Sequence, residues 1–123
     1  MEMRLEVVPL PVSDVDASKA FYVDQVGFVL DHDVEPGNGM RIVQLTPPGS
    51  GCSVVIGTGM GDPTGQSRVA NLHLVVTDIV EARTELAARG VELGEITDLG
   101  GVKYASFSDP DGNSWVLQEI PQR

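Results

Sequence analysis

Two copies of one short sequence pattern determine how this chain is organised. Residues 12–15 read Val-Ser-Asp-Val, and residues 76–79, which lie 64 positions later, read Val-Thr-Asp-Ile. When one residue is deleted from the first copy, the Gly-Phe pair at residues 27–28 aligns with the Gly-Val pair at residues 90–91. Because these matches occur in the same order, they indicate an internal duplication of the chain.

The two copies match again near their ends. Residues 53–56 read Ser-Val-Val-Ile and residues 114–117 read Ser-Trp-Val-Leu, and each segment follows a turn rich in proline and glycine. The turn at residues 109–113, Asp-Pro-Asp-Gly-Asn, has the chemistry of a hairpin rather than that of a calcium loop, which needs a glutamate farther along. The duplication therefore covers most of the chain.

The first copy is predicted to fold as β-α-β-β-β. An alternating strand over residues 4–12 precedes a helix that Ser13 caps and that stops at Gly27. Turn signals then separate three further strands, at residues 28–34, 40–46 and 52–57. Alternation places His32 on the same face as Phe28, Leu30 and Val34.

The second copy repeats this order. Its first strand covers residues 69–76, and Asp78 or Thr77 caps a helix that ends at Gly90. The remaining strands are predicted at residues 91–97, 102–108 and 113–120. One domain over residues 1–123 is therefore expected, with module 1 at residues 1–57, a linker at residues 58–68 and module 2 at residues 69–123.

The composition restricts the partners and the compartment. Eight Lys and Arg against 18 Asp and Glu give a net charge of −10, so nucleic acid and anionic membrane are poor partners. The sequence shows neither a spanning apolar run nor the pattern of a signal peptide, which predicts a cytoplasmic protein. Cys52 is the only cysteine, and this excludes an intrachain disulfide and a cysteine-cluster zinc site.

Alternation also predicts which side chains face a ligand. In the first strand of module 2, Leu72 and Leu74 face the helix, whereas Asn71 and His73 lie on the opposite face. The opposite faces of the two modules carry Val7, Pro9, Asn71, His73, Val116 and Gln118. Two modules of this size can curl their bare sheet faces around one concave space, which is where small ligands bind.

This pattern resembles the vicinal-oxygen-chelate superfamily, also called the glyoxalase/bleomycin-resistance/dioxygenase superfamily. The resemblance rests on residues 12–22, on the Gly-Phe pair at residues 27–28 and on the turn at residues 109–113. It implies an α+β fold in which two βαβββ modules form a curved, eight-stranded cleft, commonly in a homodimer. The superfamily includes isomerases, lyases, dioxygenases and drug-binding proteins, so the fold alone does not identify a reaction.

The resemblance also implies where a metal would be held. Enzymes of this superfamily place His, Gln or Glu ligands on the first and last strands of each module, and the corresponding positions of this chain are Val7, Val55, Asn71 and Val116. Three aliphatic side chains and one amide cannot retain a transition metal. We therefore predict that the usual metal site and any other cofactor are absent, as in the resistance-type members of the superfamily.

His73 is the candidate for chemistry, because imidazole carries protons near neutral pH. It is also compatible with a simple hydrogen-bonded histidine on a partly wet sheet face. A displaced metal site using His73, Gln118 and Glu119 requires a bulge, because alternation puts Gln118 and Glu119 on opposite faces.

These features predict a metal-independent small-molecule-binding protein that sequesters an antibiotic or toxic metabolite. An apolar ligand would be buried against Val7, Pro9, Val55 and Val116, while Asn71, His73 and Gln118 would supply hydrogen bonds. The alternative is a metal-dependent lyase, isomerase or dioxygenase that uses the displaced site around His73. A metal-free enzyme with His73 as general base and a domain that only dimerises are further hypotheses.

Overall fold

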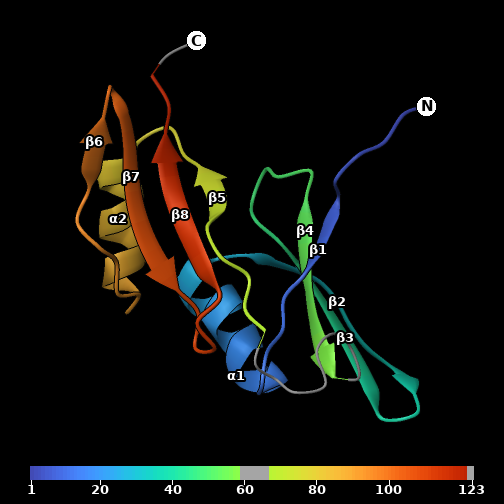
Figure 1. Ribbon diagram of the computed structural model, residues 1–123. Helices are drawn as coiled ribbons and strands as arrows, with labels where there is room; N and C mark the ends of the chain where they lie inside the picture. Colours follow the sequence, from blue (N-terminus) through green and yellow to red (C-terminus); the bar gives the residue numbers. More distant parts are fainter. Residues whose placement is uncertain (59–66, 122–123) are drawn as a thin grey trace. The chain divides into compact units, whose positions relative to one another are not determined.

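The computed structural model describes residues 1–58 and 67–121, and the chain divides into two compact units, Met1–Arg68 and Val69–Arg123 (Figure 1). Most of the predicted linker, residues 59–66, lies outside the described residues. In the part of the chain that is described, no helix is long and apolar enough to cross a membrane.

The first unit contains two helical segments and one four-stranded sheet. Its elements are β1 (Val7–Pro9), α1 (Val15–Ala20), the π-helical segment η1 (Phe21–Val26), β2 (Val29–Gly37), β3 (Met40–Thr46) and β4 (Ser53–Thr58). The strand order is β1-β4-β3-β2, with β1 parallel to β4 and the other neighbours antiparallel. The first strand of the unit therefore pairs with its last strand.

The second unit repeats this topology. Its elements are β5 (Leu72–Val75), α2 (Ile79–Ala88), β6 (Thr97–Leu99), β7 (Val102–Ser108) and β8 (Ser114–Glu119). The strand order is β5-β8-β7-β6, and again only the first and last strands pair in parallel. The expected α+β architecture of two βαβββ modules is confirmed.

Each helix begins at an aspartate. The side chain of Asp14 accepts a hydrogen bond from the backbone N–H of Ala17, and that of Asp78 accepts one from Glu81. Both caps have extended backbone, as an N-cap residue requires. The prediction of Ser13 as the first cap was wrong by one residue, whereas Asp78 was one of the two predicted caps of the second helix.

The first helix is one residue longer than the second. From cap to terminal glycine it runs from Asp14 to Gly27, and its last six residues form the π-helix η1, whereas α2 has no such segment. The N–H of Phe28 donates to the carbonyl of Tyr22, six positions earlier, while that of Val91 donates to Leu86, five positions earlier. The π-helix thus accommodates the one residue that the first sequence copy has in excess of the second.

Three predicted strands lose half of their predicted length or more in the structure. The strand expected at residues 4–12 is β1, only Val7–Pro9, and Pro11 just beyond it lacks the N–H that a ladder needs. The strand expected at 69–76 begins only at Leu72, since Asn71 has a positive φ of 59°. Residues 91–96 are not in a strand, and β6 begins at Thr97.

A register shift in β2 also overturns one face assignment. Leu30 pairs with Leu45, but His32 pairs with Gln44 on the next rung, so the chain gains one residue between the two pairs. A β-bulge of this kind changes the face of the residues that follow it. His32 consequently lies on the face opposite to Leu30, contrary to the prediction.

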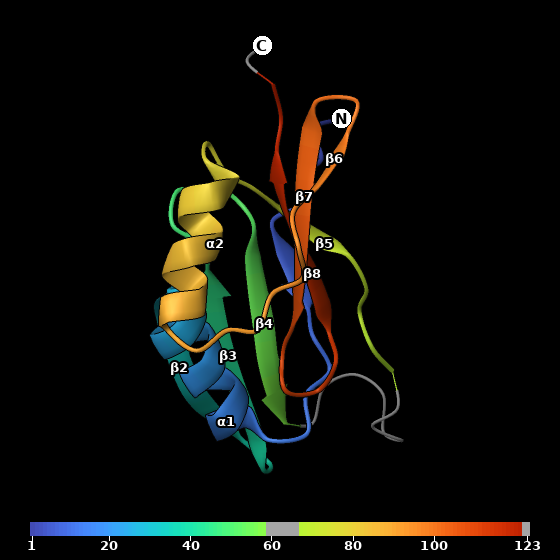
Figure 2. The ribbon, with the colours of Figure 1, turned by 90° about the vertical axis from the view of Figure 1, so that its left-hand side faces the viewer.

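Each helical segment covers one face of the sheet in its own unit. In unit 1, Tyr22 packs against Phe28 with a ring-centroid distance of 5.4 Å, and the core also contains Val43, Leu45, Val54 and Ile56. In unit 2, α2 packs against β7 and β8 (Figure 2), above a core of Ile79, Leu86, Ala105, Phe107, Trp115 and Leu117. We call the opposite side of each sheet its helix-free face.

Candidate functional site

The helix-free face of unit 1 brings together three of the predicted site residues. Pro9 pairs with Val55 across the parallel β1–β4 ladder, and Val7 lies two residues before Pro9 on the same face. Gln44 pairs with Val55 from the other side. The side chain of Val7 is 48% exposed and Val55 is half-buried. The surface formed by Val7, Pro9 and Val55 has no ionisable group and suits apolar contact.

The helix-free face of unit 2 brings together three others. His73 pairs with Val116 on β8, and Gln118 lies two residues beyond Val116 on the same face. Asn71 precedes β5 and is exposed. Val116 is only 8% exposed, whereas His73 is exposed and Gln118 is half-buried. This face therefore combines an apolar centre with polar side chains.

Tyr104 is a member of this face that the sequence prediction missed. It pairs with Gln118, and its ring meets the imidazole of His73 edge to face, with centroids 6.2 Å apart and planes at 84°. The alternation of β7 contains the necessary signal, because Ala105 and Phe107 are apolar and turn toward the helix. Tyr104 must then lie on the helix-free face.

Hydrogen bonds fix the backbone beside His73. The Nδ1 atom of His73 lies 2.8 Å from the carbonyl oxygen of Asn71, and the N–H of Asn71 donates to the Ser114 hydroxyl over 2.7 Å. Asn71 has left-handed backbone, with φ at 59°, which asparagine tolerates better than most residues. This bend directs its carbonyl to the imidazole two residues later.

The residues proposed for a displaced metal site do not converge. The register of β8 is continuous from Ser114 to Glu119, so it has no bulge, and Glu119 lies opposite to Gln118. The carboxylate of Glu119 accepts a hydrogen bond from the N–H of Ile79 at the start of α2, and it lies 3.8 Å from Lys103. Only His73 and Gln118 of that set share a face.

The side chains of the described residues do not form a metal site elsewhere either. Within residues 1–58 and 67–121, no three His, Cys, Asp or Glu side chains gather closely enough to hold a metal ion. Val7, Val55 and Val116 also carry no donor atom, so the residues at the family's ligand positions do not fit a divalent metal.

The turn before β8 is held by its own polar groups. Asp109, which is buried, accepts hydrogen bonds from the N–H groups of Asp111 and Asn113 and from the Asn113 amide, all between 2.8 and 2.9 Å. The side-chain oxygen of Asn113 accepts a bond from the N–H of Val69. The Asp109 carboxylate therefore serves the turn, as the hairpin interpretation of this segment predicts.

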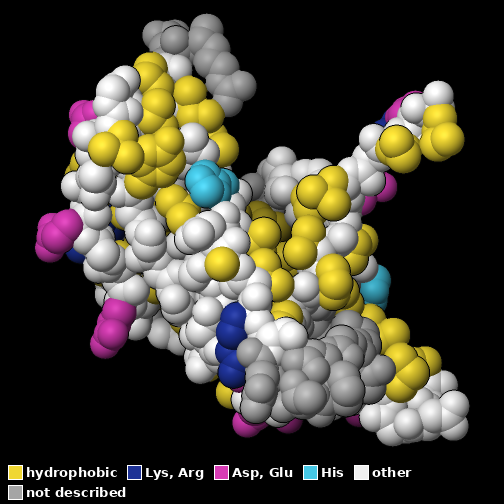
Figure 3. All heavy atoms as spheres, viewed as in Figure 1, with side chains coloured by type: hydrophobic (Ala, Val, Ile, Leu, Met, Phe, Trp, Pro, Cys, Tyr) yellow, Lys and Arg dark blue, Asp and Glu magenta, His cyan; other side chains and the backbone are white. Residues whose placement is uncertain are grey.

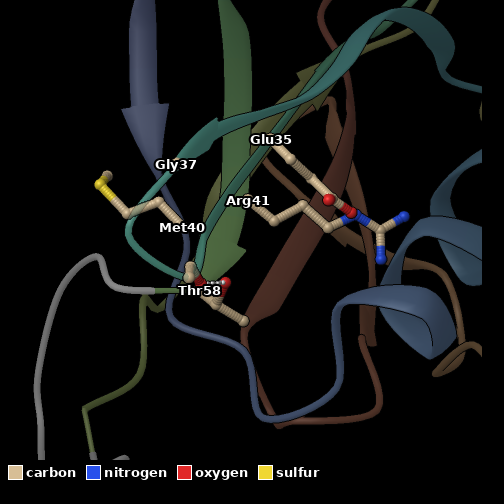
Figure 4. Close-up of a pocket in the computed structure, with 6 residues that line it drawn as sticks. Glu35, Gly37, Met40, Arg41 and Thr58 are labelled. Atoms are coloured by element: carbon tan, nitrogen blue, oxygen red, sulfur yellow. Dashed lines mark hydrogen bonds between the residues drawn. The ribbon is translucent and has the colours of Figure 1, made fainter.

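Two cavities lie within single units, and none of the predicted site residues lines either one. A cavity of about 350 Å³ at the β2–β3 hairpin is lined by Glu35, Gly37, Gly39, Met40, Arg41 and Thr58 (Figure 4). In Figure 4, Met40 extends away from Arg41, and the Thr58 hydroxyl donates to the carbonyl of Gly39. A second cavity of about 510 Å³ in unit 2 is lined mainly by Ser106, Ser108, Ser114 and Asp109.

Arg41 is already neutralised by carboxylates. Its guanidinium forms two hydrogen bonds with Asp33, of 3.0 and 2.8 Å, and one of 2.7 Å with Asp16. Lys19 adds a bond of 2.8 Å to Asp33. These cations hold the pKa of Asp33 well below its usual range, and the two carboxylates raise the pKa of Arg41. The cluster stabilises unit 1 and leaves little positive charge for an anionic ligand.

Hydrophobic side chains also reach the surface of both units (Figure 3). On the edge strand β2, Val29, Leu30 and Val34 are 53%, 39% and 45% exposed. In unit 2, Val75, Val80 and Leu99 are similarly exposed. The exposed apolar residues thus include positions outside the helix-free faces.

Comparison with known proteins gives one consistent result. The family model described as the Glyoxalase/Bleomycin resistance protein/Dioxygenase superfamily matches residues 4–117. The structure of TnmS3, an antibiotic-binding protein from Streptomyces sp. CB03234, is similar with a TM-score of 0.83 and 33% identity over 96% of each chain. A superfamily member from Sphaerobacter thermophilus has a TM-score of 0.83 and 30% identity, over 97% of this chain and 98% of the other. The uncharacterized protein YetH of Bacillus subtilis is 26% identical over 97% of this chain and 100% of its own.

Proposed function

Because this chain belongs to the Glyoxalase/Bleomycin resistance protein/Dioxygenase superfamily, we propose that it is a small-molecule-binding protein that works without a metal. Its role is to sequester an antibiotic or toxic metabolite on the helix-free faces of its two sheets. The observation that carries this proposal is the set of residues at the family's metal positions, where three valines and Asn71 replace metal-binding side chains.

The helix-free faces have the chemistry of a binding surface. Val7, Pro9 and Val55 offer apolar area, and burial of such area contributes about 25 cal/mol per Å² before ordering costs. His73 and Gln118 place hydrogen-bonding groups beside the buried Val116. Apolar area with a few oriented polar groups is the usual composition of a small-molecule site. The likeness to TnmS3, which is an antibiotic-binding protein, supports the same class of ligand.

A binding screen tests the proposal. Thermal unfolding of the full chain is followed with a panel of antibiotics and planar aromatic compounds, because a ligand that binds only the folded state raises the unfolding temperature. Each compound that does so is then titrated by calorimetry. We expect at least one compound with micromolar affinity or better. A panel that leaves the unfolding temperature unchanged throughout contradicts the proposal.

A pair of valine variants locates the binding surface. Val7→Asp puts a charge on the helix-free face, whereas Val80→Asp puts the same charge on the outer side of α2, at a position that is 59% exposed. Because both side chains are exposed, neither change removes core packing. We expect Val7→Asp to weaken binding about tenfold or more, while Val80→Asp leaves it unchanged. Equal effects of the two variants would place the ligand elsewhere.

Metal analysis separates this proposal from a metal-dependent enzyme. Protein purified without chelator is analysed for bound transition metals, and ligand binding is repeated after dialysis against EDTA. We expect substoichiometric metal and an unchanged dissociation constant. One metal per chain that is lost in His73→Ala would favour the metal-dependent lyase, isomerase or dioxygenase instead.

We also propose that the protein is a cytoplasmic homodimer. The support is that aliphatic side chains are exposed on both faces of the edge strand β2, namely Val29, Leu30 and Val34. Light scattering coupled to size exclusion should give twice the chain mass, and Leu30→Lys should shift the mass toward one chain. A monomer at micromolar concentration contradicts this part of the proposal.

A further inference from the structure

We propose that His73 presents a bare Nε2 acceptor, so that the ligand bound on the helix-free face of unit 2 carries a hydroxyl or N–H donor. This inference rests on the proposed function, because it specifies the ligand of that same surface. It assigns His73 a role in ligand selection and gives the chemical class that the site prefers.

The hydrogen bond at Nδ1 determines the tautomer of the ring. A backbone carbonyl oxygen is only an acceptor, so the contact of 2.8 Å between Nδ1 of His73 and the oxygen of Asn71 requires the proton on Nδ1. A neutral imidazole has a single N–H, and the other nitrogen then carries a lone pair. In neutral His73 that lone pair is on Nε2.

The carbonyl that sets this tautomer is held from both sides. The left-handed backbone of Asn71, with φ at 59°, turns the carbonyl toward the imidazole. The N–H of the same residue is bonded to the hydroxyl of Ser114 on β8 over 2.7 Å. Leu72, the next residue, pairs with Trp115 on β8, so the backbone on both sides of this carbonyl is attached to β8.

The Nε2 atom remains available to a ligand. His73 is exposed, and among residues 1–58 and 67–121 its ring has one hydrogen bond, to the Asn71 carbonyl, and one aromatic contact, with Tyr104. Val116, its pairing partner, supplies apolar surface beside the ring. A planar ligand with one donor group can therefore bury its rings here and donate to Nε2.

The site should discriminate between donors and matched ethers. We use 2-naphthol and 2-methoxynaphthalene as probes, because they share two fused rings and differ only in the methyl group that replaces the hydroxyl proton. A hydrogen bond to a neutral nitrogen contributes about a fivefold difference in affinity. A ligand group that can only accept, such as an ether or a carboxylate, gains no such bond from Nε2.

The first experiment measures the tautomer without any ligand. The full chain is labelled with ¹⁵N-histidine, and long-range ¹⁵N–¹H correlation spectra are recorded as a function of pH, with His32→Gln to assign the two rings. Nitrogen shifts report both the protonation state and the protonated nitrogen. We expect neutral His73 to carry its proton on Nδ1, whereas free histidine prefers Nε2. A neutral ring protonated on Nε2 overturns the inference and leaves the proposed function standing.

The second experiment measures selection between the probes. Both are titrated into the full chain, and backbone amide shifts give their dissociation constants. We expect 2-naphthol to bind about fivefold tighter than 2-methoxynaphthalene, with shifts at Val116 and Gln118. His73→Asn keeps an N–H that can donate to the Asn71 carbonyl but removes the Nε2 acceptor, so the ratio should fall to about one.

The outcomes separate the two proposals. Equal affinities in the parent protein, or a ratio that His73→Asn leaves unchanged, overturn the donor preference while binding itself is retained. Failure of both probes to bind overturns the ligand class. Failure of these probes together with every compound of the screen overturns the proposed function as well.

Discussion

The two units share one topology but differ in the side chains on their helix-free faces. Unit 1 offers Val7, Pro9 and Val55, whereas the corresponding surface of unit 2 carries His73, Gln118 and Tyr104 around Val116. Asn71 is the sequence counterpart of Val7, yet it has left-handed backbone while Val7 is in a strand. One shared topology thus supports an apolar surface in one unit and an oriented polar one in the other.

The two helix-free faces therefore suit different kinds of ligand contact. Apolar area contributes affinity with little direction, whereas hydrogen bonds select orientation and exclude mismatched ligands. The interactions that stabilise the two units differ as well. Unit 1 has the Asp33–Arg41 ion pair, and unit 2 has the Asp109–Asn113 turn. Variants at matched positions test each of these contrasts.

The largest expected effect distinguishes the two helices. Deletion of Asp24, which is exposed in the π-helix, gives the first helix the cap-to-glycine spacing of the second, so we expect a change in unfolding free energy below about 1 kcal/mol. Deletion of Glu85 in the regular helix α2 rotates Leu86 out of the core and should cost on the order of 4 kcal/mol. Urea unfolding measures both. Similar losses of unfolding free energy in the two deletions would contradict the interpretation that the π-helix holds one extra residue.

The turns before the last strand of each unit should respond differently. Asn113→Ala leaves the buried Asp109 carboxylate and the Val69 N–H without their side-chain partner, and we expect a loss of about 3 kcal/mol. In the unit 1 turn, Ser50 is exposed, so Ser50→Ala should change stability by less than about 0.5 kcal/mol. Chemical denaturation is the measurement. A small effect of Asn113→Ala would show that water replaces the amide.

Exchange of the counterparts Val7 and Asn71 tests the backbone contrast. A β-branched residue is strained at φ 59°, so Asn71→Val should lose about 1–2 kcal/mol, whereas Val7→Asn changes an exposed side chain on a strand and should cost about 0.5 kcal/mol. Thermal and urea unfolding report both values. Asn71→Gly serves as the control, because glycine adopts this conformation freely and should retain stability.

The smallest effect concerns pH. The pKa of Asp33 is lowered in the folded state, so the stability it contributes is fully present above its ordinary pKa of about 3.8 and is lost as the pH falls below that value. Asp33→Asn should therefore destabilise the protein by about 1 kcal/mol at pH 7 and progressively less in acid. Denaturation at pH 7 and pH 3 measures this. Glu85→Gln, which removes an exposed pair with Arg89, is the control with little expected effect.

Much of the fold follows from the sequence, because duplication and turn chemistry are local signals. Strands β3 and β7 match the predicted residues 40–46 and 102–108, and both terminal glycines of the helices have positive φ. Strand alternation and the glycines at the helix ends are local patterns, so these elements can be predicted without knowledge of any tertiary contact.

The errors at His32 and Tyr104 occur where distant residues decide the outcome. His32 changes face because β2 gains a residue against β3, and the gain is defined only by pairing. The contact between His73 and Tyr104 spans β8 and depends on the register of three strands. Neither the left-handed bend at Asn71 nor its bond to Ser114 has a local sequence signature, so the orientation of His73 was beyond prediction.

Parallel pairing of the first and last strands has a consequence for how each unit folds. Strands β4 and β8 lie inside their sheets, between the first strand of the unit and its third, although they are the last strands of the unit in the chain. A nascent unit therefore lacks an interior strand until its final residues have left the ribosome. Such long sequence separation slows folding and favours completion of unit 1 before unit 2.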